Sequence, residues 1–150
     1  MKKPIHEKKV YLNFREVIED IDKLYSDRVA YSFRIKPSDK EIKKKTYSEL
    51  ANDVRALTSE LVSRGVSGKH VALVGKLSYH WIVVYYSTLA AGAVLVPLDK
   101  DWLAQDLADT GAKAEVSLVF CDGDSIEKGR AIAEAAGAEE PIALERAADR

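Results

Sequence analysis

Three short groups of residues carry side chains that could do chemistry. The run Asp122-Gly-Asp-Ser125 has the composition of a loop that binds a phosphate or a cation. Asp99 and Asp101 are two carboxylates close enough along the chain to act as a pair or to ligate a metal ion. His80 is of the residue type that ligates metals or moves protons. Each group also has a structural role that competes with the chemical one.

Helix capping is the better explanation of both acidic groups. Asp99 and Asp101 stand beside a predicted helix start, where a carboxylate caps amide groups and complements the helix dipole. The run Asp122-Gly-Asp-Ser125 follows a predicted strand and precedes a predicted helix, which indicates a turn with Asp124 as the cap. We therefore expect no ligand at either group.

The three histidines show no pattern of a metal site. His6 and His70 have no metal-ligand spacing with His80. No partner for proton transfer by His80 can be identified, so a hydrogen-bonded structural histidine at the start of a buried helix is favoured. The sequence thus assigns no catalytic residue, no cofactor-binding residue and no metal-binding residue.

Lysines gather in two places. One cluster follows the predicted hairpin turn, where lysines commonly protect an exposed sheet edge and less commonly bind phosphates: Lys40, Lys43, Lys44 and Lys45. The other lies near the amino terminus, where a solvated segment is favoured over contact with an anionic membrane: Lys2, Lys3, Lys8 and Lys9. Neither cluster predicts a ligand site by itself.

Composition excludes several classes of protein. The 150 residues are 47% hydrophobic and 31% charged, enough for one domain with a core. With 23 basic and 24 acidic residues the net charge is -1, which does not favour nucleic acid as a partner. The single cysteine, Cys121, lies in an apolar run and is expected to be a buried thiol in a reducing cytoplasm. The basic start is not followed by an apolar stretch, so no signal peptide is indicated.

The stretch Leu77 to Leu98 contains 22 residues without Asp, Glu, Lys or Arg, which is long enough to span a bilayer as a helix. Gly92 favours a helix end, and Pro97 forbids continuation. The stretch therefore divides into a helix and a strand, with Pro97 ending the strand.

Periodicity and caps predict an alternation of helices and strands. The pair Asn13 and Glu16 caps the first helix, and the capping box of Thr46 with Glu49 starts the second. Predicted helices occupy Phe14–Tyr25, Tyr47–Val62 ended by Gly65, Tyr79–Ala91, Trp102–Thr110 ended by Gly111, and Ile126–Ala136 ended by Gly137. Predicted strands occupy Val29–Ile35 and a run ending at Thr46, joined by a turn at Pro37 to Asp39, then His70–Gly75, Val94–Val96 and Val116–Cys121. The tail from Ala131 to Arg150 is weakly specified and expected to be frayed.

The fold class is α/β, a mostly parallel sheet with flanking helices plus an N-terminal helix and β-hairpin. The helix Tyr79 to Ala91 is apolar on nearly every face, so it must be covered on more than one side. We expect a single partial domain over residues 1–150, with the leading helix and hairpin at 1–46, the α/β core at 47–122, and the last helix and tail at 123–150.

Three segments in order give the chain a family resemblance. Thr46-Tyr-Ser-Glu-Leu50 looks like the first core motif of the adenylate-forming superfamily, and Leu89 to Asp99 looks like the second, with Val71-Ala-Leu-Val-Gly75 between them. The likeness covers about residues 14 to 122. The runs Ser78-Tyr-x-Trp81 and Pro97-Leu-Asp-Lys100 are most similar to bacterial long-chain fatty-acid–CoA ligases.

The resemblance implies an incomplete N-terminal subdomain of an AMP-forming acyl-CoA synthetase. Such enzymes use ATP and magnesium to make an acyl-adenylate and then transfer the acyl group to CoA. The Ser/Thr/Gly-rich ATP loop of the family and its catalytic lysine do not occur before Arg150, and neither common nucleotide-binding glycine motif is present. Because transfer of an adenylyl group needs cations and backbone donors aimed at the phosphates, we expect the fragment to bind no cofactor and to be inactive alone.

The expected partners are the remainder of the same polypeptide and, for the parent enzyme, fatty acid, ATP and CoA. We expect no nucleic acid partner, a cytoplasmic or membrane-peripheral location, and self-association if the apolar helix is left uncovered. Two alternatives stay open. The chain could be a free-standing α/β binding or regulatory domain, or a fragment of an aryl or amino-acid adenylating enzyme, because the residues that select the acid are absent.

Overall fold

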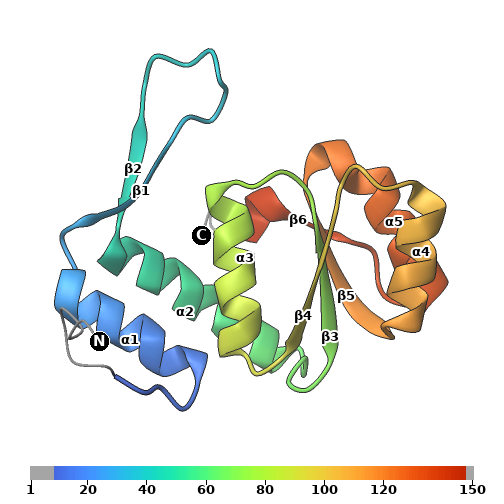
Figure 1. The fold of residues 1–150 in the computed structure, drawn as a ribbon, viewed down its shortest axis with the longest axis horizontal. Coiled ribbons are helices and arrows are strands. Elements are labelled where there is room, and N and C mark those ends of the chain that lie inside the picture. The colour runs from blue at the N-terminus through green and yellow to red at the C-terminus, as the bar shows by residue number, and fades with distance from the viewer. Residues whose placement is uncertain (1–8, 148–150) are drawn as a thin grey trace, which may run out of the picture.

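The computed structural model describes residues 9–147 (Figure 1). The helices are α1 (Phe14–Tyr25), α2 (Tyr47–Ser63), α3 (Tyr79–Ala90), α4 (Ala104–Lys113) and α5 (Ile126–Ala136). The strands are β1 (Val29–Phe33), β2 (Lys43–Thr46), β3 (His70–Val74), β4 (Val94–Leu98), β5 (Val116–Cys121) and β6 (Ile142–Ala143). Two short 3-10 turns, η1 (Gly123–Ser125) and η2 (Leu144–Ala147), follow β5 and β6.

A four-stranded parallel sheet in the order β4-β3-β5-β6 forms the centre of the molecule. Alternate residues of β3 serve different cores: Val71 and Leu73 face the helices α3, α2 and α1, whereas Ala72 and Val74 face α4 and α5. Figure 1 shows the two groups of helices on opposite sides of the sheet. The predicted α/β class with a parallel sheet is confirmed.

The apolar helix α3 is covered on more than one side, as predicted. Val83, Val84 and Thr88 are fully buried between the sheet and α2. The stretch Leu77 to Leu98 divides into α3 and β4. Within the described part of the chain, no helix combines the length and the hydropathy needed to cross a membrane.

The predicted starts of α1 and α2 are confirmed by their hydrogen bonds. The amide of Glu16 donates to Asn13 Oδ1 (3.2 Å) at the start of α1. At α2 the Glu49 amide donates to Thr46 Oγ1 (3.2 Å), while the Thr46 amide donates to Glu49 Oε2 (2.7 Å), which completes a capping box. The helical spacing of its apolar residues predicts one buried stripe along α2: Leu50, Val54, Leu57, Leu61 and Val62. The first four are buried, but the prediction is wrong for Val62, which is 44% exposed.

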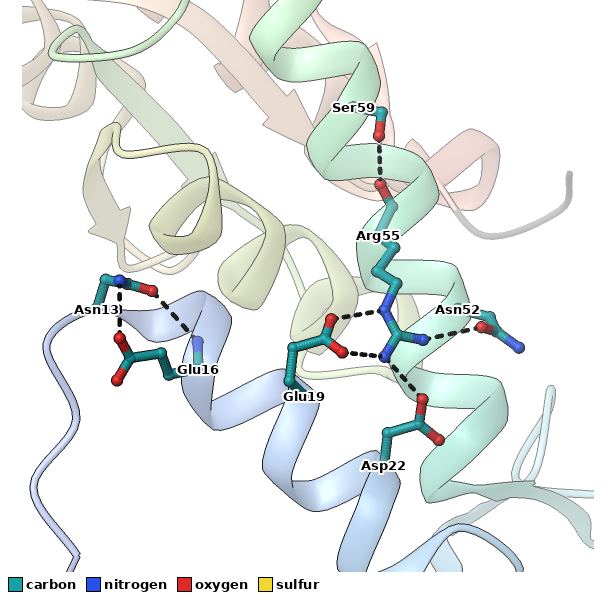
Figure 2. Close-up of polar contacts among 7 residues, drawn as sticks. All are labelled: Asn13, Glu16, Glu19, Asp22, Asn52, Arg55 and Ser59. Carbon is teal, nitrogen blue, oxygen red and sulfur yellow. Dashed lines mark hydrogen bonds and ion pairs between the residues drawn. The ribbon is translucent and has the colours of Figure 1, made fainter.

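An arginine on α2 joins α1 to α2. Arg55 donates from Nε to Glu19 Oε1 (2.9 Å) and from Nη2 to Asp22 Oδ2 (2.7 Å), and Nη1 donates to Asn52 Oδ1 (3.1 Å) (Figure 2). The guanidinium hydrogen bond holds the pKa of Asp22 below its usual value. This contact orders the leading helix against the rest of the fold.

The strand β4 continues through Pro97 to Leu98, so the prediction that Pro97 ends the strand is wrong. The reason is the position of β4 at the edge of the sheet. The Val94 amide donates to Lys69 O (2.8 Å), on the side of β3. Successive backbone nitrogens of a strand point to opposite sides, so the nitrogen of Pro97 points away from β3. The missing N–H of proline therefore costs no hydrogen bond of the ladder.

The start and end of α4 also differ from the prediction. Asp99 Oδ1 accepts from the Asp101 amide (2.9 Å), and the N-cap residue Leu103 makes no side-chain cap, so capping by Asp99 or Asp101 is wrong. Gly111 lies inside the helix instead of ending it. Its missing side chain has a packing role, because a Cβ there would stand 2.6 Å from Cγ2 of Ile132 on α5.

The expected fraying of the tail is wrong for its described part. Ile142 and Ala143 of β6 pair in parallel with Phe120 and Cys121 of β5. Leu144 follows and is 1% exposed in the core that contains α3. A two-residue strand is too short to show periodicity, so the sequence pattern could not indicate it.

Candidate functional site

The topology of the sheet creates a crevice at the carboxyl ends of β3 and β5. The chain leaves β3 toward α3 on one face of the sheet, and leaves the adjacent β5 toward α5 on the other face. Ligands of open α/β sheets bind at such a switch point. A cavity of about 330 Å³ lies there, between the end of β1, the β3–α3 loop, the first turn of α3, η1 and η2.

The base of this crevice is built around Asp122. Its Oδ2 accepts from the Lys76 amide (2.6 Å) and its Oδ1 accepts from the Ser125 amide (2.9 Å). Gly75 has a φ of 150° and approaches so closely that a Cβ would stand 2.9 Å from Asp122 Cγ. The Asp122 carboxylate is therefore used in joining the two strand ends.

Two further charged groups of the crevice form a pair, whereas Arg34 and Glu145 line it without an ion pair in the described part of the chain. Lys76 Nζ forms an ion pair with Asp124, which raises the pKa of Lys76 and lowers the pKa of Asp124. The predicted turn at Asp122-Gly-Asp-Ser125 is confirmed, but its cap is Asp122 and not Asp124. At the start of α3, Ser78 Oγ accepts from the Trp81 amide (3.2 Å).

His80 lines the crevice on the first turn of α3 and is half-buried. Its ring packs edge-on against Tyr79, with centroids 6.1 Å apart at 68°. His70 begins β3 at the opposite edge of the sheet, and His6 lies outside the described residues. Among residues 9–147 no three His, Cys, Asp or Glu side chains are grouped to hold a metal ion.

The only cysteine is Cys121, at the end of β5. It is fully buried, as expected from its apolar run, and burial raises the pKa of its thiol to about 11. A protonated and inaccessible thiol is a poor nucleophile. Cys121 is therefore a packing residue.

The hairpin forms one wall of the crevice through a polar and aromatic cluster that the sequence pattern missed. Phe33 stacks on Tyr79 with centroids 5.3 Å apart and ring planes 2° from parallel. Tyr79 Oη donates to Asp53 Oδ2 (2.6 Å), and Lys45 Nζ donates to the same oxygen (2.9 Å). Burial, and then the Asp53 contact, raises the pKa of Tyr79. Lys45 thus belongs to an internal ion pair, whereas Lys40, Lys43 and Lys44 are exposed.

Two of the other hollows are larger and lie away from this edge. One of about 590 Å³ is at the amino edge of the sheet, beside Lys69 and Glu115. The other, of about 500 Å³, lies between α1 and α2 and is lined by Ile18, Val54 and the exposed Val62. Neither holds a cluster of nucleophiles, acids or bases that suggests chemistry.

The two segments that resemble core motifs of a family have structural roles in this fold. Thr46 to Leu50 starts α2, while Leu89 to Asp99 ends α3, turns at Gly92 with φ 72°, and forms β4. At the crevice, Lys76 and Asp124 neutralise each other and Asp122 accepts from backbone amides. Of the described cationic side chains of Lys and Arg that line the crevice, Lys76 is thus paired and Arg34 is not.

The comparisons with known proteins agree with this fold. The model of the family described as AMP-binding enzyme matches residues 18–149. The long-chain-fatty-acid–CoA ligase FadD15 of Mycobacterium bovis is 32% identical over 81 residues, which cover 53% of this chain and 14% of that protein.

Two solved structures are similar in fold. The long-chain-fatty-acid–CoA ligase FadD1 of Archaeoglobus fulgidus has a TM-score of 0.79 at 18% identity, covering 99% of this chain and 32% of that chain. The inhibitor-bound N-terminal domain of FACL13 from Mycobacterium tuberculosis has a TM-score of 0.76 at 20% identity, covering 91% of this chain and 35% of that chain. The chain thus spans about a third of these structures and a smaller part of the curated relative.

Proposed function

Because this chain belongs to the family of AMP-binding enzymes, we propose that it is the amino-terminal scaffold of an AMP-forming long-chain fatty-acid–CoA ligase and is inactive alone. In the parent enzyme, ATP and magnesium would activate the acid as an acyl-adenylate, and CoA would receive the acyl group. The match covers only about a third of the two similar structures and 14% of the curated relative, which supports the role of a scaffold and not of a whole enzyme.

The crevice at the carboxyl edge of the sheet is the observation that carries the proposal. It lies where an open α/β sheet binds its ligand, yet Lys76 pairs with Asp124 and Asp122 accepts from two backbone amides. Arg34 is left as the one cation of the described lining without an ion pair. A triphosphate would need uncommitted cations and amides at that place. A single unpaired guanidinium does not match a triphosphate, so the residues present do not fit ATP.

The remainder of the same polypeptide is the proposed partner. On α3 the side chains of Trp81, Tyr85 and Leu89 share one face at four-residue spacing and are half-exposed. Among residues 9–147 the neighbouring strand β4 pairs on one side only, and its Val94 is 47% exposed. Apolar surface of this kind favours docking of a further domain or self-association. The buried thiol of the chain suits the proposed cytoplasmic location.

The experiment measures release of pyrophosphate from Mg·ATP in the presence of palmitate, with the purified chain and with a complete long-chain fatty-acid–CoA ligase as the positive control. We expect the chain to stay at the level of a reaction without enzyme. Turnover by the chain above that level contradicts the inactive scaffold. The same assay on a polypeptide extended by the codons downstream of position 150 should show activity with palmitate.

Two alternatives give different results in the same experiments. Activity of the extended polypeptide with aryl or amino acids, but not with palmitate, would identify an aryl or amino-acid adenylating enzyme. Sedimentation of the chain as a compact monomer that takes up no hydrophobic dye would favour a free-standing binding or regulatory domain. The scaffold predicts association or dye uptake through the face of α3 and the edge of β4.

A further inference from the structure

The β1–β2 hairpin is anchored at its base and free at its tip. At the base, Phe33 stacks on Tyr79 and Lys45 pairs with Asp53. Beyond Phe33 the chain makes a nine-residue loop before Lys43, and Figure 1 shows this loop standing away from the helices. The side chains of residues 34–44 are exposed except for the half-buried Asp39. An anchored base therefore presents an exposed tip, defined here as residues 34–44.

The tip concentrates positive charge on a chain whose net charge is -1. It contains five basic residues and two acidic ones, which gives a local net charge of +3. The basic residues are Arg34, Lys36, Lys40, Lys43 and Lys44. In the part of the chain that the structure describes, none of these five forms an ion pair with a carboxylate. One of the two acids, Asp39, instead accepts from the Lys36 amide (2.9 Å) in the turn.

Two large aliphatic side chains lie among these charges. Ile35 is 64% exposed at the start of the loop and Ile42 is 49% exposed at its end. Exposed aliphatic groups surrounded by lysines and arginine match the interface of an anionic bilayer, where apolar groups enter the acyl boundary and basic groups contact the headgroups. Single-stranded nucleic acid is bound largely by stacking on aromatic rings, and residues 34–44 contain no aromatic residue.

We propose that the hairpin tip, residues 34–44, is a docking element for membrane surfaces rich in anionic lipid. The proposal does not depend on the ligase function: Arg34 and Ile35 also line the crevice, but the four lysines of the tip and Ile42 do not. Binding is electrostatic at long range, so it weakens with salt, and apolar at contact through Ile35 and Ile42.

The experiment is flotation of the full chain with phosphatidylcholine vesicles, with and without phosphatidylserine. We expect binding that requires phosphatidylserine and that is lost between about 0.1 M and about 1 M salt, as the Debye length falls from ~10 to ~3 Å. The triple variant Lys40→Gln, Lys43→Gln, Lys44→Gln should weaken binding by about a hundredfold, since each basic group near such a surface contributes about fivefold. The double variant Ile35→Ser, Ile42→Ser should weaken it by about tenfold.

Matched controls change the same residue types on other surfaces. The first is Lys23→Gln, Lys69→Gln, Lys113→Gln, three exposed lysines outside the hairpin. The second is Leu24→Ser, Leu103→Ser, whose leucines are 64% and 72% exposed. Both should bind vesicles as the unchanged chain does.

Three results overturn the proposal: no binding of the unchanged chain to anionic vesicles, equal losses in tip and control variants, or binding of a fluorescent oligonucleotide without binding of vesicles. Circular dichroism of every variant checks that the fold is retained.

Discussion

Replacing Gly111 by alanine tests the contact between α4 and α5 and separates two explanations of this glycine. In the structure Gly111 is buried inside α4, and an added Cβ would stand 2.6 Å from Cγ2 of Ile132, which is fully buried. A β-branched methyl held in a core cannot swing away, so overpacking should cost about 1–3 kcal/mol. Alanine regains about 1 kcal/mol of helix propensity. The net loss of stability should be about 1 kcal/mol.

The second arm of the experiment removes the clash. Ile132→Ala alone should cost about 2–5 kcal/mol because it leaves a cavity. In that background Gly111→Ala meets no methyl group, and only the propensity gain of about 1 kcal/mol remains. The same substitution therefore changes sign, with a coupling energy of about 2 kcal/mol between the two sites.

Equilibrium denaturation of the four proteins in the cycle measures these values. If Gly111 instead ended the helix in the left-handed conformation, as its sequence position suggested, alanine would cost about 1 kcal/mol in both backgrounds. Equal effects of Gly111→Ala with and without Ile132 would refute the close contact of α4 with α5.

Three further predictions concern single residues. Arg55→Gln should lower the free energy of unfolding by about 1 kcal/mol at neutral pH. Because the folded-state pKa of Asp22 is lowered, this contribution is present above the unfolded pKa of about 3.9 and is lost as the pH falls through the folded pKa. Denaturation curves of the variant and the unchanged chain should therefore converge in acid, and a constant difference between them contradicts this. Thr46→Ala should cost about 1 kcal/mol by thermal or chemical unfolding, and Thr46→Ser should restore most of it; equal stability of all three proteins refutes the capping box. Iodoacetamide should alkylate Cys121 of the folded chain at mildly alkaline pH only as fast as the chain unfolds, whereas rapid alkylation in native buffer would show that the thiol is accessible.

Local signals in the sequence were sufficient for most elements. The capping residues Asn13 and Thr46 start α1 and α2 as predicted, and the bounds of β5 and α5 agree with the structure. Two of the failures share one cause, which is tertiary context. Pro97 is accepted within β4 because that strand lies at an edge, and Gly111 continues a helix because another helix crosses it closely.

The crevice could be predicted in outline and not in its contacts. Alternating strands and helices indicate a ligand edge at the carboxyl ends of the strands. The ion pair of Lys76 with Asp124 joins residues far apart in the chain, and the bond of Tyr79 to Asp53 joins two helices. Such contacts depend on strand order and helix packing, and no local pattern of residues specifies them.

Titration of the isotope-labelled chain with Mg·ATP, followed by amide NMR, tests most directly whether residues 1–150 lack the means to hold a nucleotide. The proposed scaffold predicts that the amide signals of Lys76, Ser78 and Asp124 show no saturable shift, because the Lys76 side chain is paired with Asp124 and the Lys76 amide donates to Asp122. A saturable shift confined to this crevice would contradict the account.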